Sequence, residues 1–256
     1  MDRAVSVGGF VTISRLPQPV TAELTPTRIR AARVAELAAT AGGHLAESDE
    51  PALTAYLQRH WPGDELAELL DHERADIVKI AAICLGLTGT MAQSPRLARA
   101  LHHDDYFVVN IAERGLWNIW FRASTPECGA LLADAIAAMH AERFDDCEHT
   151  LDRILLLDPH FAEACNQRAV LHYLTGRFAS SLMACRRTLA LNPHHFGAAA
   201  GVGHNHLQLG QYSDAEAAYR RALQIHPRME GVRQQLRQAR AGMPGHVTRA
   251  TWRNPR

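Results

Sequence analysis

The sequence predicts an all-α protein, a right-handed α-solenoid of stacked helical hairpins, and three observations carry that prediction. The chain is 47% hydrophobic but only 6% aromatic, and its apolar residues are mostly Ala and Leu, which favour helices over strands. A motif returns at a fixed interval in the second half of the chain, from Pro159 to Pro193 to Pro227, and a weaker pattern returns at a slightly shorter interval in the first half. Fixed periods of this length are typical of helical repeat arrays.

The N-terminal part of the chain predicts one helical hairpin after an irregular start. Residues 1–24 show no helical period, and we expect a loose arm there. Residues 27–41 and 50–58 predict two helices that turn at the glycine pair 42–43, because paired glycines commonly mark turns. The Trp-Pro-Gly sequence at 61–63 is the expected exit turn.

Five apolar positions recur in the same register over residues 64–121. The first set is Leu66, Leu70, Val78, Ala81 and Leu85, and the second, at a constant offset from it, is Leu97, Leu101, Val109, Ala112 and Leu116. Acidic residues precede the Val of each set. This arrangement resembles the short HEAT-like repeat, which implies an α-hairpin with an acidic turn before its second helix. The basic residue that this family carries after the Val is Lys79 in the first copy, whereas the second copy has Asn110.

Four columns recur three times at one constant spacing in the second half of the chain. The repeat-defining residues are Phe144, Pro159, Gly176, Phe178, Pro193, Gly210, Tyr212 and Pro227, with Glu142 in the glycine column of the first copy and Leu155, Leu189 and Leu223 in the fourth column. These residues resemble the tetratricopeptide-repeat (TPR) family. The resemblance implies repeats at 128–161, 162–195 and 196–229, followed by a closing helix at 230–241.

Each column has a physical role in a helical hairpin. Gly176 and Gly210 fall in the turn between the two helices, where a positive φ costs a glycine nothing. The prolines end the second helix, because Pro lacks an N–H and clashes with the preceding turn. Phe178 and Tyr212 are expected to fill the wedge between neighbouring hairpins.

A helix start at residues 124–127 marks the beginning of the second array. Thr125 is the expected N-cap, Pro126 suits the first turn, and Glu127 suits the positive end of the helix dipole. We therefore expect a HEAT-like domain at 25–123, a TPR domain at 124–242, and a basic, flexible tail at 243–256.

Motifs for metal binding or catalysis do not occur in the sequence. The densest cluster of candidate ligands, His102 to Asp105, falls in a predicted turn, and there is no HExxH motif or paired CxxC. Gly201 and Gly203 begin like a dinucleotide-binding fingerprint, but they fall inside a predicted helix with no strand before it. No GxSxG nucleophile motif is present. We expect no enzyme activity, no cofactor and no metal.

The cysteines and the hydropathy pattern indicate a reducing compartment. The cysteines are Cys84, Cys128, Cys147, Cys165 and Cys185, and their spacing fits no disulfide framework. The last three fall on packing positions of the repeat, where a buried thiol is inert. No apolar run approaches the length that a membrane span needs, and no cleavable signal is recognised. The sequence predicts a cytoplasmic protein.

The TPR resemblance implies a concave groove lined by the first helix of each repeat. The groove positions are Leu132, Ile136, Met139, His140, Glu163, Asn166, Val170, Tyr173, Leu174, Ala200, His204, Leu207 and Gln208, continued by Gln234 and Gln238 on the closing helix. We expect four polar members, Asn166, Tyr173, His204 and Gln208, to contact a bound peptide. For apolar members such as Val170 the alternative is packing between helices.

One partner class of the TPR family is not expected. TPR domains that hold the acidic C-termini of heat-shock chaperones grip the terminal carboxylate with a Lys/Asn/Arg clamp. The matching positions in this sequence are Leu132, Ile136, Gln167, Gly197 and Gly201. None of these residues carries a charge that would hold a carboxylate.

The sequence therefore predicts a non-catalytic scaffold that binds a protein or peptide partner. The alternative is a regulatory or accessory subunit of an enzyme complex, docked through the HEAT-like half. Nucleic-acid binding is less favoured: six Arg stand against Glu230 alone in residues 230–256, and charge on a chain end commonly serves only solubility. The 27 basic and 27 acidic residues cancel, so no membrane partner is expected either.

Overall fold

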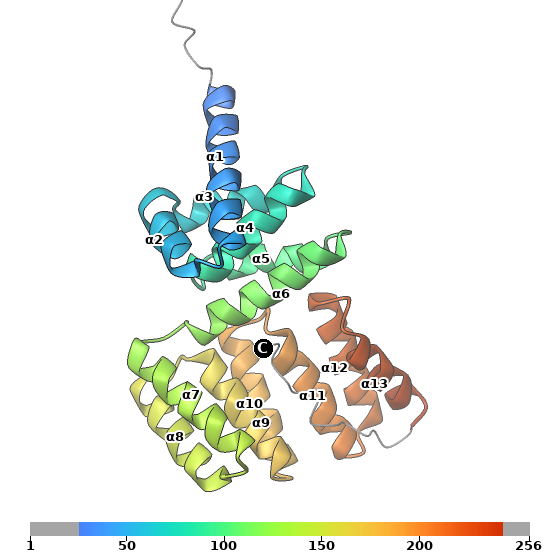
Figure 1. Cartoon of the computed structure of the whole chain (residues 1–256). Helices are drawn as coiled ribbons and strands as arrows, with labels where there is room; N and C mark the ends of the chain where they lie inside the picture. The colour runs from blue at the N-terminus through green and yellow to red at the C-terminus, as the bar shows by residue number, and fades with distance from the viewer. Residues whose placement is uncertain (1–25, 243–256) are drawn as a thin grey trace, which may run out of the picture. The chain divides into compact units, whose positions relative to one another are not determined.

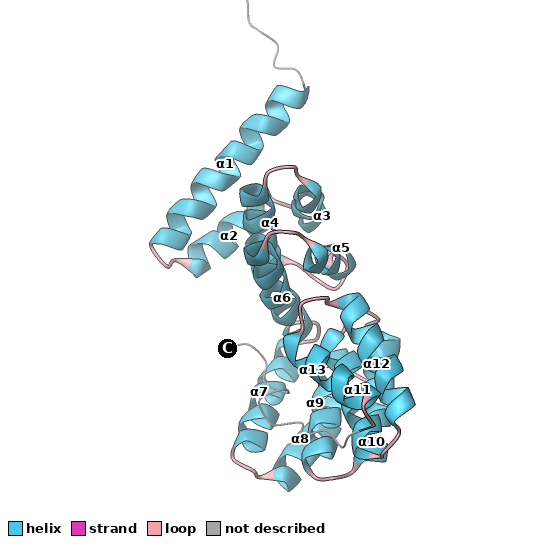
Figure 2. Cartoon of the chain, turned by 90° about the vertical axis from the view of Figure 1, so that its right-hand side faces the viewer, coloured by secondary structure: helices cyan, strands magenta, loops and turns pink. Residues whose placement is uncertain are grey.

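The computed structural model describes residues 26–242. Within this range the chain forms thirteen α-helices and two short 3-10 helices, with no strand (Figure 2). The predicted all-α repeat fold is confirmed. The arm predicted at 1–24 and the tail predicted at 243–256 lie outside the described residues.

The chain divides into two compact units between Leu37 and Ala38. Helix α1, Pro26–Ala46, crosses this boundary, and its residues up to Leu37 are the described part of the first unit. Both sets of repeats belong to the second unit.

The prediction of a turn at the glycine pair 42–43 is wrong. Both glycines lie inside α1, and the chain turns instead at residues 47–49, where Ser48 has a φ of 58°. Asp49 then caps α2, Glu50–His60, by accepting a hydrogen bond at 3.0 Å from a backbone amide of its first turn. A glycine costs a helix interior only about 0.5–1 kcal/mol, and the Ala-rich sequence around the pair favours the helix.

The two HEAT-like hairpins share one form, in which a short α-helix and a 3-10 turn precede a longer α-helix. The first consists of α3 (Gly63–Glu68), η1 (Leu69–Asp71) and α4 (Ala75–Thr88), and the second of α5 (Ser94–Arg99), η2 (Ala100–His102) and α6 (Tyr106–Phe121). Every element of the second hairpin begins at the same offset from its counterpart in the first. All ten apolar residues that predicted this repeat are buried, so the offset marks a structural repeat.

Contacts between α4 and α6 help to join these hairpins. A Cβ on Gly86 in α4 would lie 3.1 Å from the Cα of Gly115 in α6, so the absence of both side chains lets the helices cross closely. Nζ of Lys79 lies 2.6 Å from Oδ2 of Asp105. The other carboxylate oxygen of Asp105, Oδ1, caps α6 by accepting from the Phe107 amide at 2.7 Å. The basic residue of the first hairpin therefore binds the acidic turn of the second.

Seven further helices form three hairpins and a closing helix (Figure 1). They are α7 (Pro126–His140), α8 (Phe144–Leu157), α9 (Ala162–Leu174), α10 (Phe178–Leu191), α11 (Phe196–Gln208), α12 (Tyr212–Ile225) and α13 (Glu230–Arg240). Each helix packs against the next one in the sequence. The second helices begin at the three evenly spaced residues of the aromatic column, Phe144, Phe178 and Tyr212. Thr125 caps α7 as predicted, accepting from the Cys128 amide at 3.2 Å.

The turns within the hairpins follow the glycine column. Gly176 and Gly210 have φ values of 73° and 71°, and Glu142 takes the same left-handed conformation in the first hairpin, with a φ of 58°. Residues in this conformation let a helix end and the chain reverse. Each second helix ends two residues before its proline, as predicted.

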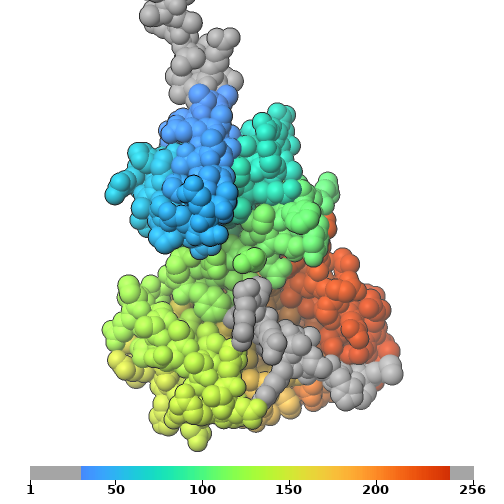
Figure 3. All heavy atoms as spheres, in the orientation of Figure 1, coloured from blue at the N-terminus to red at the C-terminus, as the bar shows by residue number. Residues whose placement is uncertain are grey.

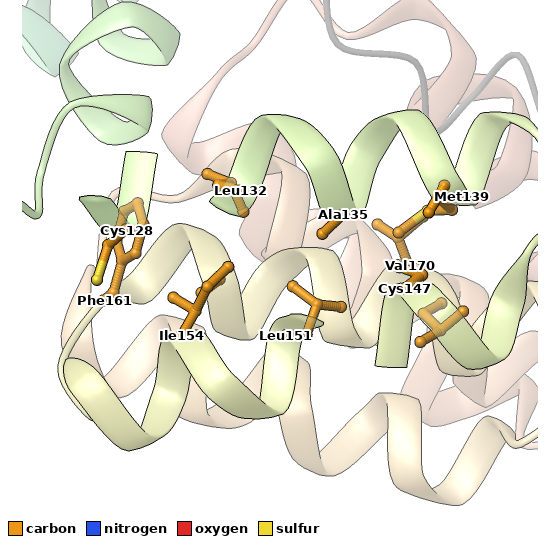
Figure 4. Packing of buried hydrophobic residues seen from close by; sticks show 12 residues of the cluster. Cys128, Leu132, Ala135, Met139, Cys147, Leu151, Ile154, Phe161 and Val170 are labelled. Atoms are coloured by element: carbon orange, nitrogen blue, oxygen red, sulfur yellow. The ribbon is translucent and has the colours of Figure 1, made fainter. Parts of the chain in front are cut away.

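The core of the first hairpin shows how its two helices pack. Leu132 and Ala135 from α7 and Leu151 and Ile154 from α8 lie between the two helices, together with Cys147 (Figure 4). All five side chains are buried. Each helix thus buries its apolar face against its neighbour, which neither could do alone.

Helix α6 joins the HEAT-like hairpins to the TPR-type array. Its Trp117 and Trp120 pack against His195 and Phe196 at the start of α11, with ring centroids 4.4–5.3 Å apart. Figure 3 shows α6 directly against the array in the space-filling view. The two arrays therefore share one core within the second unit.

Candidate protein-binding face

Four helices of the array lie next to one another and form what we call the first-helix face. They are α7, α9 and α11, the first helices of the three hairpins, and the closing helix α13. Helix α7 contacts α9, α9 contacts α11, and α11 contacts α13. Every position that the sequence assigned to a groove lies on these helices.

Most of the apolar groove positions are part of the core. The buried ones are Leu132, Met139, Val170, Ala200 and Leu207. Ile136 and Leu174 are half-buried and pack against the core of the first two hairpins. Figure 4 shows Leu132, Met139 and Val170 among the core side chains. These residues therefore pack between helices, which was the alternative to lining a groove.

Three of the four residues expected to contact a peptide lie together. Nε2 of Gln208 donates to the hydroxyl of Tyr173 at 3.0 Å, and the rings of Tyr173 and His204 lie 6.5 Å apart. Nδ1 of His204 lies 2.8 Å from the hydroxyl of Tyr219 in α12. Tyr173 and His204 are buried, whereas Gln208 is exposed. These residues form a polar chain from α9 to α11.

Burial keeps this polar chain neutral. Desolvation lowers the pKa of His204 to about 3, so its imidazole is uncharged at neutral pH. Desolvation also raises the pKa of Tyr173, against a smaller opposite effect of the hydrogen bond from Gln208. It raises the pKa of Tyr219 as well. The chain can offer hydrogen bonds to a ligand but no charge.

Asn166, the fourth expected contact residue, bonds within its own helix. Its Nδ2 donates to Oε1 of Glu163 at 3.1 Å, and the side chain is buried. Its Oδ1 has no hydrogen-bond partner among the described residues. A buried acceptor without a donor costs roughly 1–3 kcal/mol, so this oxygen is a local cost to the fold inside the array.

The carboxylate of Glu163 is the centre of a buried network. Nε2 of Gln167 donates to its Oε1 at 2.7 Å, and Nε2 of His195 lies 2.9 Å from its Oε2. Nδ1 of His195 accepts from the Ala198 amide at 3.0 Å, so the ring carries its proton on Nε2 and donates it to Glu163. The imidazole also stacks on Trp120 of α6, with centroids 4.4 Å apart. Glu163 thus joins the second and third hairpins to α6.

Sequence reasoning assigned Glu163 to the groove and did not single out His195. A partial signal exists, because Glu163, Asn166 and Gln167 are spaced i, i+3 and i+4 and therefore share one side of a helix. Nothing local identifies the partner, which lies 32 residues further along the chain.

The remaining groove positions differ in exposure. His140 and Gln234 are exposed, and Gln238 is half-buried, with an Oε1 that has no partner among the described residues. At the carboxylate-clamp positions Gln167 bonds to Glu163, and a Cβ on Gly197 would lie 3.0 Å from the Trp117 ring. Packing within the protein therefore occupies these two positions.

The thiols of this chain are poor nucleophiles. All five cysteines are buried and free. Burial raises the pKa of Cys84 and Cys185 to about 12 and that of Cys147 to about 11. Across residues 26–242 no three His, Cys, Asp or Glu side chains are grouped so as to hold a metal ion. None of the helices in that range is both long and apolar enough to cross a membrane.

Comparisons with known proteins find similar folds but no similar sequences. Neither a scan against family models nor a search of curated proteins gives a match. One similar structure is the first TPR domain of Spaghetti (RPAP3) bound to an HSP90 peptide, with a TM-score of 0.45, 19% identity, and coverage of 46% of this chain and 94% of that one. Another is the Sgt2 TPR domain from Aspergillus fumigatus, with a TM-score of 0.45, 17% identity, and coverage of 46% and 80%.

A third similar structure is a thermophilic TPR protein from Thermus thermophilus. Its TM-score is 0.36 at 15% identity, over 81% of this chain and 99% of that one. These likenesses are weak, and the assignment of a TPR-type helical array rests on this chain's own helix spacing, left-handed turns and buried columns.

Proposed function

We propose that this chain is a non-catalytic scaffold that binds a protein segment or peptide along the first-helix face. The exposed amide of Gln208 supports the proposal most directly, because it stands on this face and its Nε2 is held by the Tyr173 hydroxyl at 3.0 Å. A backbone N–H or C=O of an extended ligand would pair with that amide. Asn166, on the neighbouring helix, is buried and supports the face from within through its bond to Glu163.

The proposal that the chain is not an enzyme rests on its candidate nucleophiles. A thiol reacts as its thiolate, and burial keeps the pKa of Cys84, Cys147 and Cys185 far above neutral. Five buried free thiols also suit a reducing compartment such as the cytoplasm.

Peptide selection followed by matched variants tests the proposed face. Peptides that bind the full chain would be selected from a displayed library, and their Kd measured for Gln208→Ala and Gln234→Ala, both exposed on the first-helix face. Met183→Ala is the control, since Met183 is an exposed residue of α10, a second helix. We expect at least tenfold weaker binding for Gln208→Ala, a smaller loss for Gln234→Ala and no change for the control. An unchanged Kd in both face variants would mean that the peptide binds elsewhere on the protein.

An accessory-subunit role is the second candidate, and one surface feature favours it. Tyr106 and Phe107, at the start of α6, are 57% and 66% exposed, and their rings lie 6.0 Å apart. Exposed aromatic pairs are frequent anchors of protein interfaces. If a catalytic partner docks on the HEAT-like half, Tyr106→Ser/Phe107→Ser should release it while peptide binding to the first-helix face is unchanged.

We propose further that the face does not clamp a terminal carboxylate. Ile136 is apolar and Gln167 already binds Glu163, so no cation stands at these two clamp positions. A peptide that ends in acidic residues and the same peptide with an amidated C-terminus should therefore bind equally. Tighter binding of the free acid would contradict this.

A further inference from the structure

A cleft of about 360 Å³ lies where the second HEAT-like hairpin meets the TPR-type array. Arg99 and His102 line it from α5 and η2. His194 lines it from the turn between α10 and α11, and Arg221 and Gln224 line it from α12. Its volume falls within the range of small-molecule sites, roughly 300–1,000 Å³.

The charges in this cleft are all of one sign. Two arginines and two histidines line it, and no acidic residue does. Arg221 makes no ion pair with a described residue, and Arg99 reaches only Asp71, at 3.8 Å, which Arg96 approaches more closely. Both guanidinium groups therefore keep most of their capacity to bind an anion.

Contacts around the cleft hold its two sides together without a ligand. Nη2 of Arg228 donates to the backbone oxygens of His103 and Asp104 at 3.2 and 2.8 Å. Nε2 of His226, at the end of α12, lies 3.1 Å from Oε2 of Glu113 in α6. The basic groups are therefore brought together before binding, which lowers the ordering cost of holding a ligand.

We propose that this cleft binds a phosphate monoester. Two guanidinium charges balance a phosphate monoester dianion, whereas a single carboxylate would leave one of them uncompensated. The planar fork of Arg matches the phosphate oxygens, and His102 and His194 add ring N–H donors. The C-terminal end of α12 opposes an anion with about half an elementary charge, which the two arginines outweigh. Apolar Ile225 and the Gln224 amide line the room left for the organic group.

This site is separate from the first-helix face and draws its residues from both arrays. A ligand would bridge α5 and η2 to α12, so it would resist opening of the two arrays relative to each other. Binding to the native state alone also raises stability, by an amount that grows with the logarithm of the ligand concentration once the site is largely filled.

Calorimetric titration of the full chain with phenyl phosphate tests the proposal. We expect one saturable site in the wild type and at least tenfold weaker binding in Arg99→Glu/Arg221→Glu. The control is Arg59→Glu/Arg186→Glu, which changes the net charge equally through two exposed arginines of α2 and α10 outside the cleft. Circular dichroism would show whether each variant is folded. Absence of saturable binding, or an equal loss in the control, would overturn the proposal.

Two further probes distinguish the source of the phosphate group and check its place. A phosphoserine peptide that binds at least tenfold more tightly than phenyl phosphate would identify a modified partner protein, and the reverse order a small metabolite. Phenyl phosphate should also slow amide hydrogen exchange in both 94–103 and 221–228. Protection on one side only, or at the first-helix face, would contradict a cleft shared by the two arrays.

Discussion

The ring of Tyr219 sets the distance between the two helices of the third hairpin. A Cβ on Gly203 would lie 2.5 Å from that ring, closer than any real contact allows. The Tyr219 hydroxyl lies 2.8 Å from Nδ1 of His204, so the residue next to the glycine holds the same ring by its polar end. One aromatic side chain therefore explains both a glycine and a buried histidine in α11.

Protonation of His204 should destabilise the protein as the pH falls. Its pKa is about 3 in the folded state and about 6.5 when unfolded. The unfolded state therefore binds more protons below pH 6.5, and stability is lost as the pH falls from there toward 3. At pH 5 this amounts to a loss on the order of 2 kcal/mol. Urea unfolding of His204→Gln should show a correspondingly smaller loss between pH 7 and 5. His140→Gln, at an exposed position, should keep the wild-type slope, and equal slopes in all three proteins would contradict the prediction.

Replacing Glu142 with glycine should stabilise the first hairpin. Glu142 has a φ of 58°, a conformation that costs a residue with a Cβ roughly 1–2 kcal/mol. Glycine takes it freely, as Gly176 and Gly210 do in the other two hairpins. After the greater entropy of glycine in the unfolded chain is subtracted, a gain of about 1 kcal/mol is expected. Thermal unfolding of Glu142→Gly and Glu142→Ala would measure it, and only the glycine variant should be stabilised.

Each hairpin is defined by where its helices stop. In the TPR-type array a left-handed residue ends the first helix and a proline follows the second. In the HEAT-like hairpins a 3-10 turn and an acidic turn separate the helices, and Asp105 caps α6 directly. These are local devices, so each hairpin carries its own boundaries.

Valine at position 210 should damage the third hairpin selectively. Gly210 has a φ of 71°, with open space around its missing Cβ, so a substitution costs backbone strain and no collision. A β-branched residue resists that φ, and a loss of roughly 1–3 kcal/mol is expected. Hydrogen exchange should become faster in 196–241, extend into α9 and α10 and into α6, which packs on the start of α11, and leave α3 and α4 protected, because repeat arrays are stabilised by nearest neighbours.

Gly210→Asn is the matched control, since asparagine tolerates a positive φ better than valine does. It should exchange nearly as slowly as the wild type. Uniform loss of protection over the whole chain in the valine variant would indicate one cooperative globule instead of an array.

At the scale of the whole second unit, the network around Glu163 joins three helices that are far apart in the sequence, α6, α9 and α11. Glu163 in α9 binds His195, which begins α11 and stacks on Trp120 of α6. Both members of the Glu163–His195 pair are fully buried. This core crosses the predicted boundary between residues 123 and 124. The division into domains at 25–123 and 124–242 stays a prediction.

Breaking the Glu163–His195 pair should therefore be costly. His195→Ala leaves a buried carboxylate with one donor fewer, and a loss of roughly 1.5–3 kcal/mol is expected. His195→Gln keeps a side-chain N–H donor and should be less destabilised than His195→Ala. Urea unfolding measures both, with the exposed His160→Ala as control. A His195→Gln variant less stable than His195→Ala would contradict a penalty that comes from the lost donor.

The sequence by itself determined the repeats, their register and most helix ends. The offset within 64–121 located ten buried side chains, and the constant spacing of the aromatic column located the starts of α8, α10 and α12. These features are set by nearby residues, such as a glycine at a positive φ, a proline or an N-cap such as Thr125. A stretch of a few residues is therefore enough to predict where a helix begins or ends. The turn predicted at the glycine pair 42–43 did not form, because the cost of glycine in a helix is small and the helix-favouring neighbours outweigh it.

Only the tertiary structure decided which polar residues are internal and which are available. Asn166 and Gln208 were grouped as equal contacts, yet one is buried beside Glu163 and the other is exposed. The partner of Glu163 is 32 residues away, and the cleft draws on Arg99 and Arg221 from different arrays. Such contacts depend on how helices cross and on which residue meets which across the gap, and a helical period fixes only the side of the helix, not what lies opposite it.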